Sequence, residues 1–146
     1  MRRFGLLVVA VVLMGADQPK SKEVAAEEKR FEGTWRFASL EIEGKALPKD
    51  AFSKAKLVLK GDTHTYSNPS STSHGTFVVN PDVKPKTLDV TFSDGPEKGN
   101  TLHGIYELEA DTYRLCISLG GKPRPMAFVS EPGSGHVLEV LKRETR

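Results

Sequence analysis

Four histidines could supply metal ligands in this chain. His64, His74, His103 and His136 lie on four separate segments, and no two of them have the His-x-His spacing that sets two ligands on one strand face. The single cysteine, Cys116, cannot form a Cys-x-x-Cys pair. The sequence therefore predicts no metal site.

Nucleophilic catalysis has no recognisable motif either. The chain lacks Gly-x-Ser-x-Gly, the turn that presents a catalytic serine in many hydrolases. Cys116 lies between Leu115 and Ile117, where a free cysteine is usually a small buried apolar residue, and only Arg114 beside it carries a charge that favours a thiolate. We expect no Ser-His-Asp or cysteine nucleophile.

The remaining motifs also have simple structural interpretations. Glu107, Glu109 and Asp111 alternate along one strand face and enter a turn, which is typical of a solvated edge rather than a general acid and base. The Gly133-Ser134-Gly135 segment precedes the strand-like run 137–141, whereas a phosphate-binding loop precedes a helix. We predict that the protein is not an enzyme and needs no cofactor.

Aromatic and polar residues at inward strand positions are the candidates for a ligand site. In the clearest strand, Leu88, Val90 and Phe92 alternate with polar residues, so one face is buried and the other solvated. The same reasoning over the other strands gives the predicted ligand-binding residues His64, Tyr66, Phe77, Phe92, Tyr106, Met126 and Phe128. Among them, His64 and Tyr106 could orient a ligand through a polar contact.

Short strand-like runs separated by turn residues indicate an all-β fold. The predicted strands cover residues 34–42, 56–60, 63–67, 75–80, 87–92, 101–109, 112–118, 126–130 and 136–142. Gly61-Asp62 and Ala110-Asp111 are two-residue hairpin turns, which pair their flanking strands antiparallel. Residues 48–55 offer a short helix beginning at Pro48, which could act as a lid.

The two ends of this series carry residues that can close it into a barrel. In a closed barrel the first and last strands are neighbours, so Trp35, after Gly33, can stack against the Arg143 guanidinium as a structural plug. Along the first strand, the apolar side chains change from one face to the other near Ala38-Ser39, which predicts a bulge there. We therefore predict an antiparallel up-and-down β-barrel of about eight strands, with a short N-terminal helix.

The N-terminal region predicts export. Residues 1–16 combine two arginines with a short apolar run, the layout of a cleaved signal peptide, and this run is too short to span a bilayer. Residues 17–30 form a polar linker or a short helix that Ser21 could cap; a disordered tail is the alternative. The barrel domain covers residues 31–143, and we expect a periplasmic, cell-surface or secreted monomer without a membrane span.

The charge balance excludes one class of partner. Residues 1–16 hold two of the 21 Lys and Arg residues and none of the 19 Asp and Glu residues, so the processed chain carries 19 of each. Nucleic-acid binding depends on clustered excess positive charge. We expect no nucleic-acid partner.

A set of short motifs follows a fixed order along the chain: Phe31-Glu32-Gly33-Thr34-Trp35, Ser39-Leu40-Glu41, Gly44-Lys45, Ser93-Asp94-Gly95-Pro96, Gly104-Ile105-Tyr106-Glu107-Leu108, Pro132-Gly133-Ser134-Gly135-His136 and Leu141-Lys142-Arg143. With these motifs, residues 31–143 resemble an uncharacterised family of exported lipocalin-like domains that is expanded in planctomycete bacteria. The resemblance implies a lipocalin-like barrel and export. It implies no activity.

Three functions remain open from the sequence. The barrel could bind a small, partly apolar molecule in its interior, which we favour. It could bind a protein, as a protease-inhibitor-like barrel whose segment 17–32 enters a partner's cleft. It could also be a structural envelope domain with a filled core. A cavity in the structure would favour the first function and a solid barrel the third.

Overall fold

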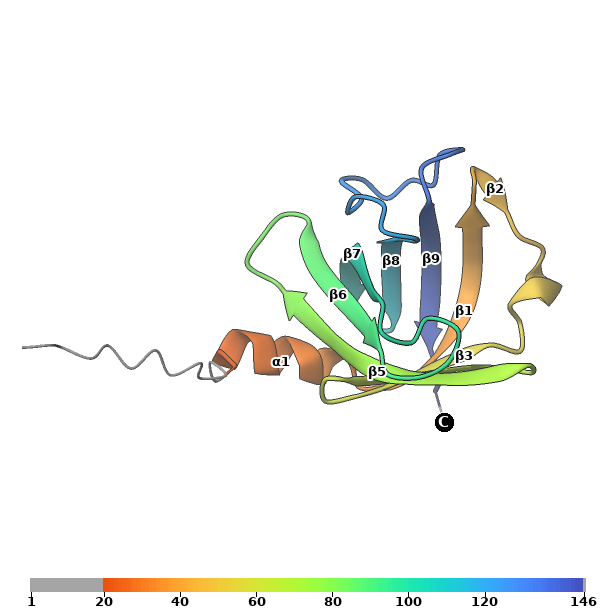
Figure 1. The fold of residues 1–146 in the computed structure, drawn as a ribbon. Helices are drawn as coiled ribbons and strands as arrows, with labels where there is room; N and C mark the ends of the chain where they lie inside the picture. Colours follow the sequence, from red (N-terminus) through yellow and green to blue (C-terminus); the bar gives the residue numbers. More distant parts are fainter. Residues whose placement is uncertain (1–19, 146) are drawn as a thin grey trace, which may run out of the picture.

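A barrel of antiparallel strands, closed at one end by a helix, forms residues 20–145, the part of the chain that the computed structural model describes (Figure 1). The predicted signal peptide lies outside these residues. The elements are α1 Lys22–Phe31, β1 Gly33–Ile42, β2 Lys45–Ala46, the 3-10 turn η1 Lys49–Ala51, β3 Lys56–Lys60, β4 Thr63–Asn68, β5 Ser71–Asn80, β6 Lys86–Phe92, β7 Thr101–Glu109, β8 Thr112–Ser118 and β9 His136–Arg143.

Eight strands close the barrel, as predicted. Each of β3 to β8 pairs antiparallel with the next strand along the chain, and β1 pairs with both β3 and β9. The two-residue strand β2 folds back on the end of β1. The register of β1 against β9 shifts between Phe37 and Ser39, which confirms the predicted bulge. A bulge bends a strand and increases its twist, which favours closure of the sheet.

Local sequence determines the tight hairpins. The turns 61–62 and 110–111 join β3 to β4 and β7 to β8 without further loop residues. Gly61 has a φ of 59°, a conformation that glycine adopts without steric penalty. Both predicted two-residue turns are confirmed.

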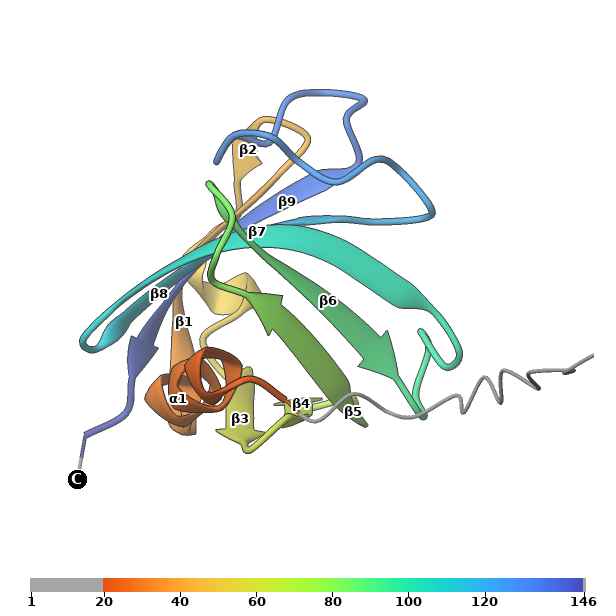
Figure 2. The ribbon, with the colours of Figure 1, turned by 90° about the vertical axis from the view of Figure 1, so that its left-hand side faces the viewer.

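The segment before the barrel is a helix that covers one end of it, called here the α1 end (Figure 2). Ser21 caps α1 by accepting a hydrogen bond from the Val24 amide through its Oγ, at 3.2 Å. Phe31, at the last position, is 1% exposed and packs edge-on against Phe77, Tyr106 and Tyr113. Because α1 buries this ring in the barrel, residues 22–31 are not a disordered tail.

The predicted plug lies at the same end. The Arg143 guanidinium lies 4.3 Å from the centre of the Trp35 ring, and Trp35 is fully buried. The Trp35 Nε1–H donates to the Phe31 carbonyl at 2.8 Å, and Arg143 donates to the carbonyls of Arg30 and Glu32. Gly33 leaves the space that this guanidinium occupies. The pair therefore also fixes the C-terminal end of α1, whose carbonyls favour a nearby cation.

The opposite end carries the longer connections and is called here the η1 end. The segment between β2 and β3 forms η1, visible as the yellow turn on the far side from α1 in Figure 1. It is a single 3-10 turn within residues 48–55, where the sequence predicts a short helix. Phe52 and Ala55, which follow η1, are nonetheless buried against the barrel.

Residues 126–130 do not form the predicted strand. Strand β8 pairs directly with β9, so residues 119–135 are a loop over the outside of the barrel wall. Arg124 holds this loop by donating to the carbonyls of Leu88 and Gly104, at 3.0 and 2.7 Å, and the neighbouring Pro125 is buried. Proline lacks the amide hydrogen that a ladder needs, and the apolar residues around 126–130 gave a misleading strand pattern.

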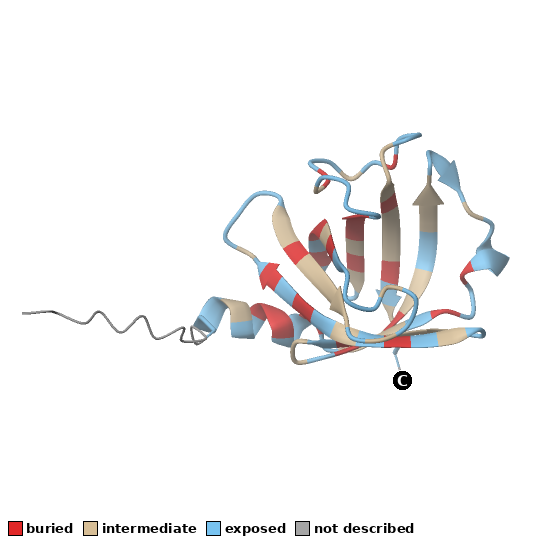
Figure 3. Cartoon of the chain, viewed as in Figure 1, coloured by how far each residue is buried: buried red, intermediate tan, exposed pale blue. Residues whose placement is uncertain are grey.

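Burial along the strands follows the barrel geometry. Buried positions alternate with exposed ones along β5, as the red and pale blue bands of Figure 3 show. Within residues 20–145, no helix has the length and apolar character needed to cross a membrane.

Candidate functional site

The barrel encloses an apolar cavity of about 240 Å³. It extends from the Phe31 ring at the α1 end to Phe52 and Ala55 at the η1 end. Its walls are almost entirely aliphatic and aromatic, and the further lining residues are Phe37, Leu40, Ala51, Leu57, Leu59, His64, Tyr66, Phe77, Leu88, Val90, Phe92, Leu102, Tyr113, Leu115, Ile117, Leu119, Val137 and Glu139. The barrel interior is therefore not filled by its own side chains.

Four of the seven predicted ligand-binding residues line this cavity. They are His64 and Tyr66 on β4, Phe77 on β5 and Phe92 on β6. Each points inward because side chains alternate between the two faces of a strand. The two-residue period of the sequence was sufficient to place them.

Tyr106 faces inward but lies at the α1 end of the barrel, outside the set of residues that line the cavity. It is fully buried, and its hydroxyl donates to the Glu27 carboxylate of α1 at 2.8 Å. Burial would raise the pKa of Glu27, but hydrogen bonds from Lys86 and Tyr106 and the charge of Arg30 lower it overall. Tyr106 therefore joins helix to barrel, and the prediction that it lines a ligand site is wrong.

Met126 and Phe128 lie outside the barrel. Met126 is 90% exposed, and the Phe128 ring packs under the Arg114 guanidinium, 4.1 Å away on the outer surface. Their assignment to the lining depended on the strand over 126–130. Because that segment is a loop, the prediction for both residues is wrong.

His64 contributes a polar side chain to the cavity wall, and this side chain is held in one orientation. Its Nε2–H donates to the Thr91 carbonyl at 3.0 Å, and its ring packs edge-on against Phe92 at 4.9 Å. Burial lowers the pKa of His64. The imidazole is therefore neutral at pH 7, and Nδ1 is left as a hydrogen-bond acceptor.

Gly75 makes room for the His64 ring. A Cβ atom at this inward position of β5 would overlap the Thr91 carbonyl oxygen and lie 2.5 Å from His64 Nε2. The backbone oxygen cannot move without breaking the β5–β6 ladder. The hydrogen bond between His64 and Thr91 therefore depends on glycine at position 75.

We predict that Gly75→Ala lowers the free energy of unfolding by about 3 kcal/mol, the upper range for overpacking a well-packed interior. Gly61→Ala is the control, since a Cβ there has no atom within 4 Å and meets only the backbone cost of a positive φ, about 1 kcal/mol. Urea denaturation measures both. Equal stability of Gly75→Ala and the wild type would show that this close approach does not exist.

Glu139 is the cavity residue that sequence reasoning missed. It lies in the middle of β9, between Leu40 of β1 and Leu115 of β8 in the ladder. Val137 and Leu141 share its inward face, so a charged residue within an apolar period-two pattern was the available signal. Burial raises its pKa to about 7.

The surroundings of Glu139 leave its carboxylate without a partner. Within residues 20–145, neither hydrogen bonds nor opposite charges offset the effect of its burial. The nearby Tyr113 hydroxyl has its own pKa raised well above the usual range, by burial and by the Glu139 charge. Both polar groups line the cavity, so their free surface faces its interior.

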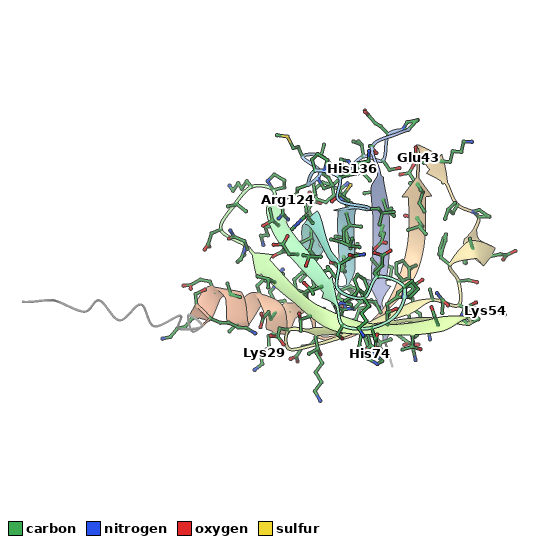
Figure 4. All side chains as sticks on the ribbon, viewed as in Figure 1. Lys29, Glu43, Lys54, His74, Arg124 and His136 are labelled. Carbon is green, nitrogen blue, oxygen red and sulfur yellow. The ribbon has the colours of Figure 1, made fainter. Side chains whose placement is uncertain are left out.

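The other histidines lie on the outside. His74 and His103 pair with Asp94 and Asp89, and in Figure 4 His74 and His136 lie on opposite sides of the molecule. Among the described residues, no three His, Cys, Asp or Glu side chains come together as metal ligands. His64 and His74 lie on the neighbouring strands β4 and β5, whereas His103 is on β7 and His136 begins β9.

Comparisons with protein-family models, curated proteins and solved structures find no match for this chain. The resemblance to exported lipocalin-like domains therefore stays a prediction.

Proposed function

We propose that this barrel binds a small, largely apolar molecule in its interior and does not transform it. The observation that carries the proposal is the cavity of about 240 Å³ with aliphatic and aromatic walls. Pockets with mainly apolar walls and a few polar groups are typical binding sites for small, largely apolar molecules.

The cavity volume limits the size of the ligand. A cavity of about 150 Å³ accommodates benzene, and pockets for drug-sized molecules start at about 300 Å³. A space of about 240 Å³ suits one ring with a short substituent. Burying roughly 200 Å² of ligand surface contributes about 5 kcal/mol before the entropic costs of binding, so we expect modest affinity.

Binding is favoured over conversion by the residue types in the wall. None of the described lining residues is a serine, cysteine or lysine, and His64 keeps its Nε2–H in a hydrogen bond to the backbone. The part of the cavity wall that the structure describes therefore has no Ser, Cys or Lys nucleophile that His64 could activate.

The two other functions from the sequence have less support. A filled structural core does not account for the cavity. An inhibitor segment over residues 17–32 would have to be free, yet residues 22–31 form α1, which buries Glu27, Glu28 and Phe31. Moving this helix into a partner's cleft would expose the barrel end.

Filling the cavity tests the proposal. We expect indole or toluene, at about tenfold its Kd, to raise the free energy of unfolding by about 1.4 kcal/mol and the melting temperature by about 4 °C. Val90→Phe places a ring in the cavity and should abolish this shift, because Val90 lines the wall.

Val78→Phe is the matched control. Val78 lies one strand away on β5, is 63% exposed and points outward, so the same substitution leaves the cavity unchanged. Its ligand-induced shift should equal that of the wild type. If neither probe shifts the wild-type melting temperature, or if both variants respond like the wild type, the proposal is refuted.

A further inference from the structure

An unpaired carboxylate is an unusual group for the wall of an apolar cavity. Glu139 is half-buried in the cavity wall, and its neighbours across both ladders, Leu40 and Leu115, are aliphatic. Removing a carboxylate from water without a partner is strongly unfavourable, so proteins normally pair such a group or exclude it. A leucine here would continue the apolar face of β9. The carboxylate therefore calls for an explanation beyond packing.

The other polar groups of the cavity provide no positive charge for it. Tyr113 on β8 and Tyr66 on β4 are neutral phenols, and His64 on β4 is a neutral imidazole with its Nδ1 as acceptor. None of the described lining residues is a lysine or arginine. The interior thus presents apolar surface, two phenol hydroxyls, the Nδ1 acceptor of His64 and one acidic group, Glu139.

We infer that the ligand of this cavity is a small organic cation, an arylalkyl or alkyl ammonium, whose N–H groups donate to the Glu139 carboxylate while its hydrocarbon part fills the apolar space. This inference rests on the proposed function and specifies its ligand. The Glu139 carboxylate already lies among apolar walls in the unbound state, so binding costs it less hydration than it would cost a carboxylate on the protein surface.

Other ligand classes fit this interior less well. A carboxylic acid would bring a second negative charge next to Glu139 in surroundings where like charges repel strongly. A pure hydrocarbon would leave the carboxylate buried and unpaired. A cationic donor with a hydrocarbon part matches both the apolar walls and the carboxylate.

Three probes of nearly the same shape test this assignment. We expect calorimetric titration at pH 8 to show benzylammonium binding at least about tenfold more tightly than benzyl alcohol, since hydrogen bonds to charged groups are worth about that factor or more. Alkylammonium groups keep their proton at this pH. Benzoate should bind more weakly than benzyl alcohol.

Three variants distinguish the contribution of the carboxylate to binding from the contribution of the cavity volume. Glu139→Gln preserves the shape of the side chain and should remove the preference for benzylammonium while keeping the affinity for benzyl alcohol. Glu109→Gln removes the same charge from an exposed position on β7 and should retain the preference. Val90→Phe should abolish binding of both probes.

The outcomes distinguish the two proposals. Equal binding of benzylammonium and benzyl alcohol, lost in Val90→Phe and unaffected by Glu139→Gln, would overturn the cation assignment and leave the proposed function in place. Loss of the preference in Glu109→Gln as well would attribute it to overall charge and overturn the assignment too. If no probe binds, including indole and toluene, both proposals fall.

Discussion

Replacing Trp35 with alanine is expected to lower the free energy of unfolding by about 3–5 kcal/mol, the range for removing a fully buried large aromatic side chain. Trp35 is 0% exposed and packs edge-on against Tyr113 at 5.7 Å. Its Nε1–H also holds the last turn of α1 through the Phe31 carbonyl. The variant therefore loses core packing and the attachment of the helix together. Urea denaturation followed by far-UV circular dichroism measures the change.

Two further variants divide this effect. Trp35→Phe keeps a ring over which Arg143 can lie but loses the hydrogen bond to Phe31, so it should fall between wild type and Trp35→Ala. Arg143→Ala removes the stacked guanidinium and its hydrogen bonds to backbone carbonyls, which we expect to cost about 2–3 kcal/mol. A Trp35→Ala protein as stable as the wild type would contradict the plug.

Glu139→Gln is expected to stabilise the protein above pH 7 and to leave its stability nearly unchanged relative to wild type at pH 4. The folded state raises the pKa of this carboxyl from 4.5 to about 7. Between these values the folded protein keeps a proton that the unfolded chain has lost, so wild-type stability falls as the pH rises through this window. The pKa rises from 4.5 to about 7, and each pKa unit corresponds to about 1.36 kcal/mol. Wild-type unfolding free energy is therefore lower by about 3 kcal/mol once the pH reaches about 7 to 8.

The measurement is the difference in unfolding free energy between wild type and Glu139→Gln at each pH. Four other groups have lowered pKa values: Glu27, Asp89, Asp94 and His64. Their titration changes the unfolding free energy of both proteins alike, so its contribution cancels in the difference. Glu109→Gln should give a difference that does not vary with pH in this way. A flat difference for Glu139→Gln would mean that the carboxyl is solvated in the folded protein.

The placement of Glu139 affects both the stability of the folded protein and its proposed ligand binding. The same burial that destabilises the folded protein at neutral pH keeps the carboxylate available for a cationic ligand. Binding of such a ligand should therefore restore part of the stability that Glu139→Gln gains. Sites that carry a function commonly retain groups that stability alone would replace.

Local sequence was sufficient where neighbouring residues decide the structure. The turns at Gly61-Asp62 and Ala110-Asp111 depend on two residues each, and Ser21 caps α1 through the amide three positions away. The parity change near Ala38-Ser39 predicted the bulge, because the pleat of a strand is strictly two residues long. These features depend only on residues that are close together in the sequence.

Local sequence failed where distant contacts decide. Met126 and Phe128 lie in an apolar run, yet the anchoring of Arg124 to β6 and β7 and the direct pairing of β8 with β9 keep that run outside the barrel. Tyr106 has the inward parity of a lining residue, but its depth in the barrel and the arrival of Glu27 from α1 remove it from the cavity. Parity gives the direction of a side chain and not its level along the barrel axis.

The sequence by itself determined the closed barrel, since the alternation along the strands and the placement of Trp35 and Arg143 at its two ends leave few other ways to bury the apolar faces. Only the tertiary structure decided that the interior holds a cavity and that Glu139 lines it without a partner. The physical reason is that an empty volume and an unpaired charge are properties of how side chains from eight strands meet. No single strand carries that information.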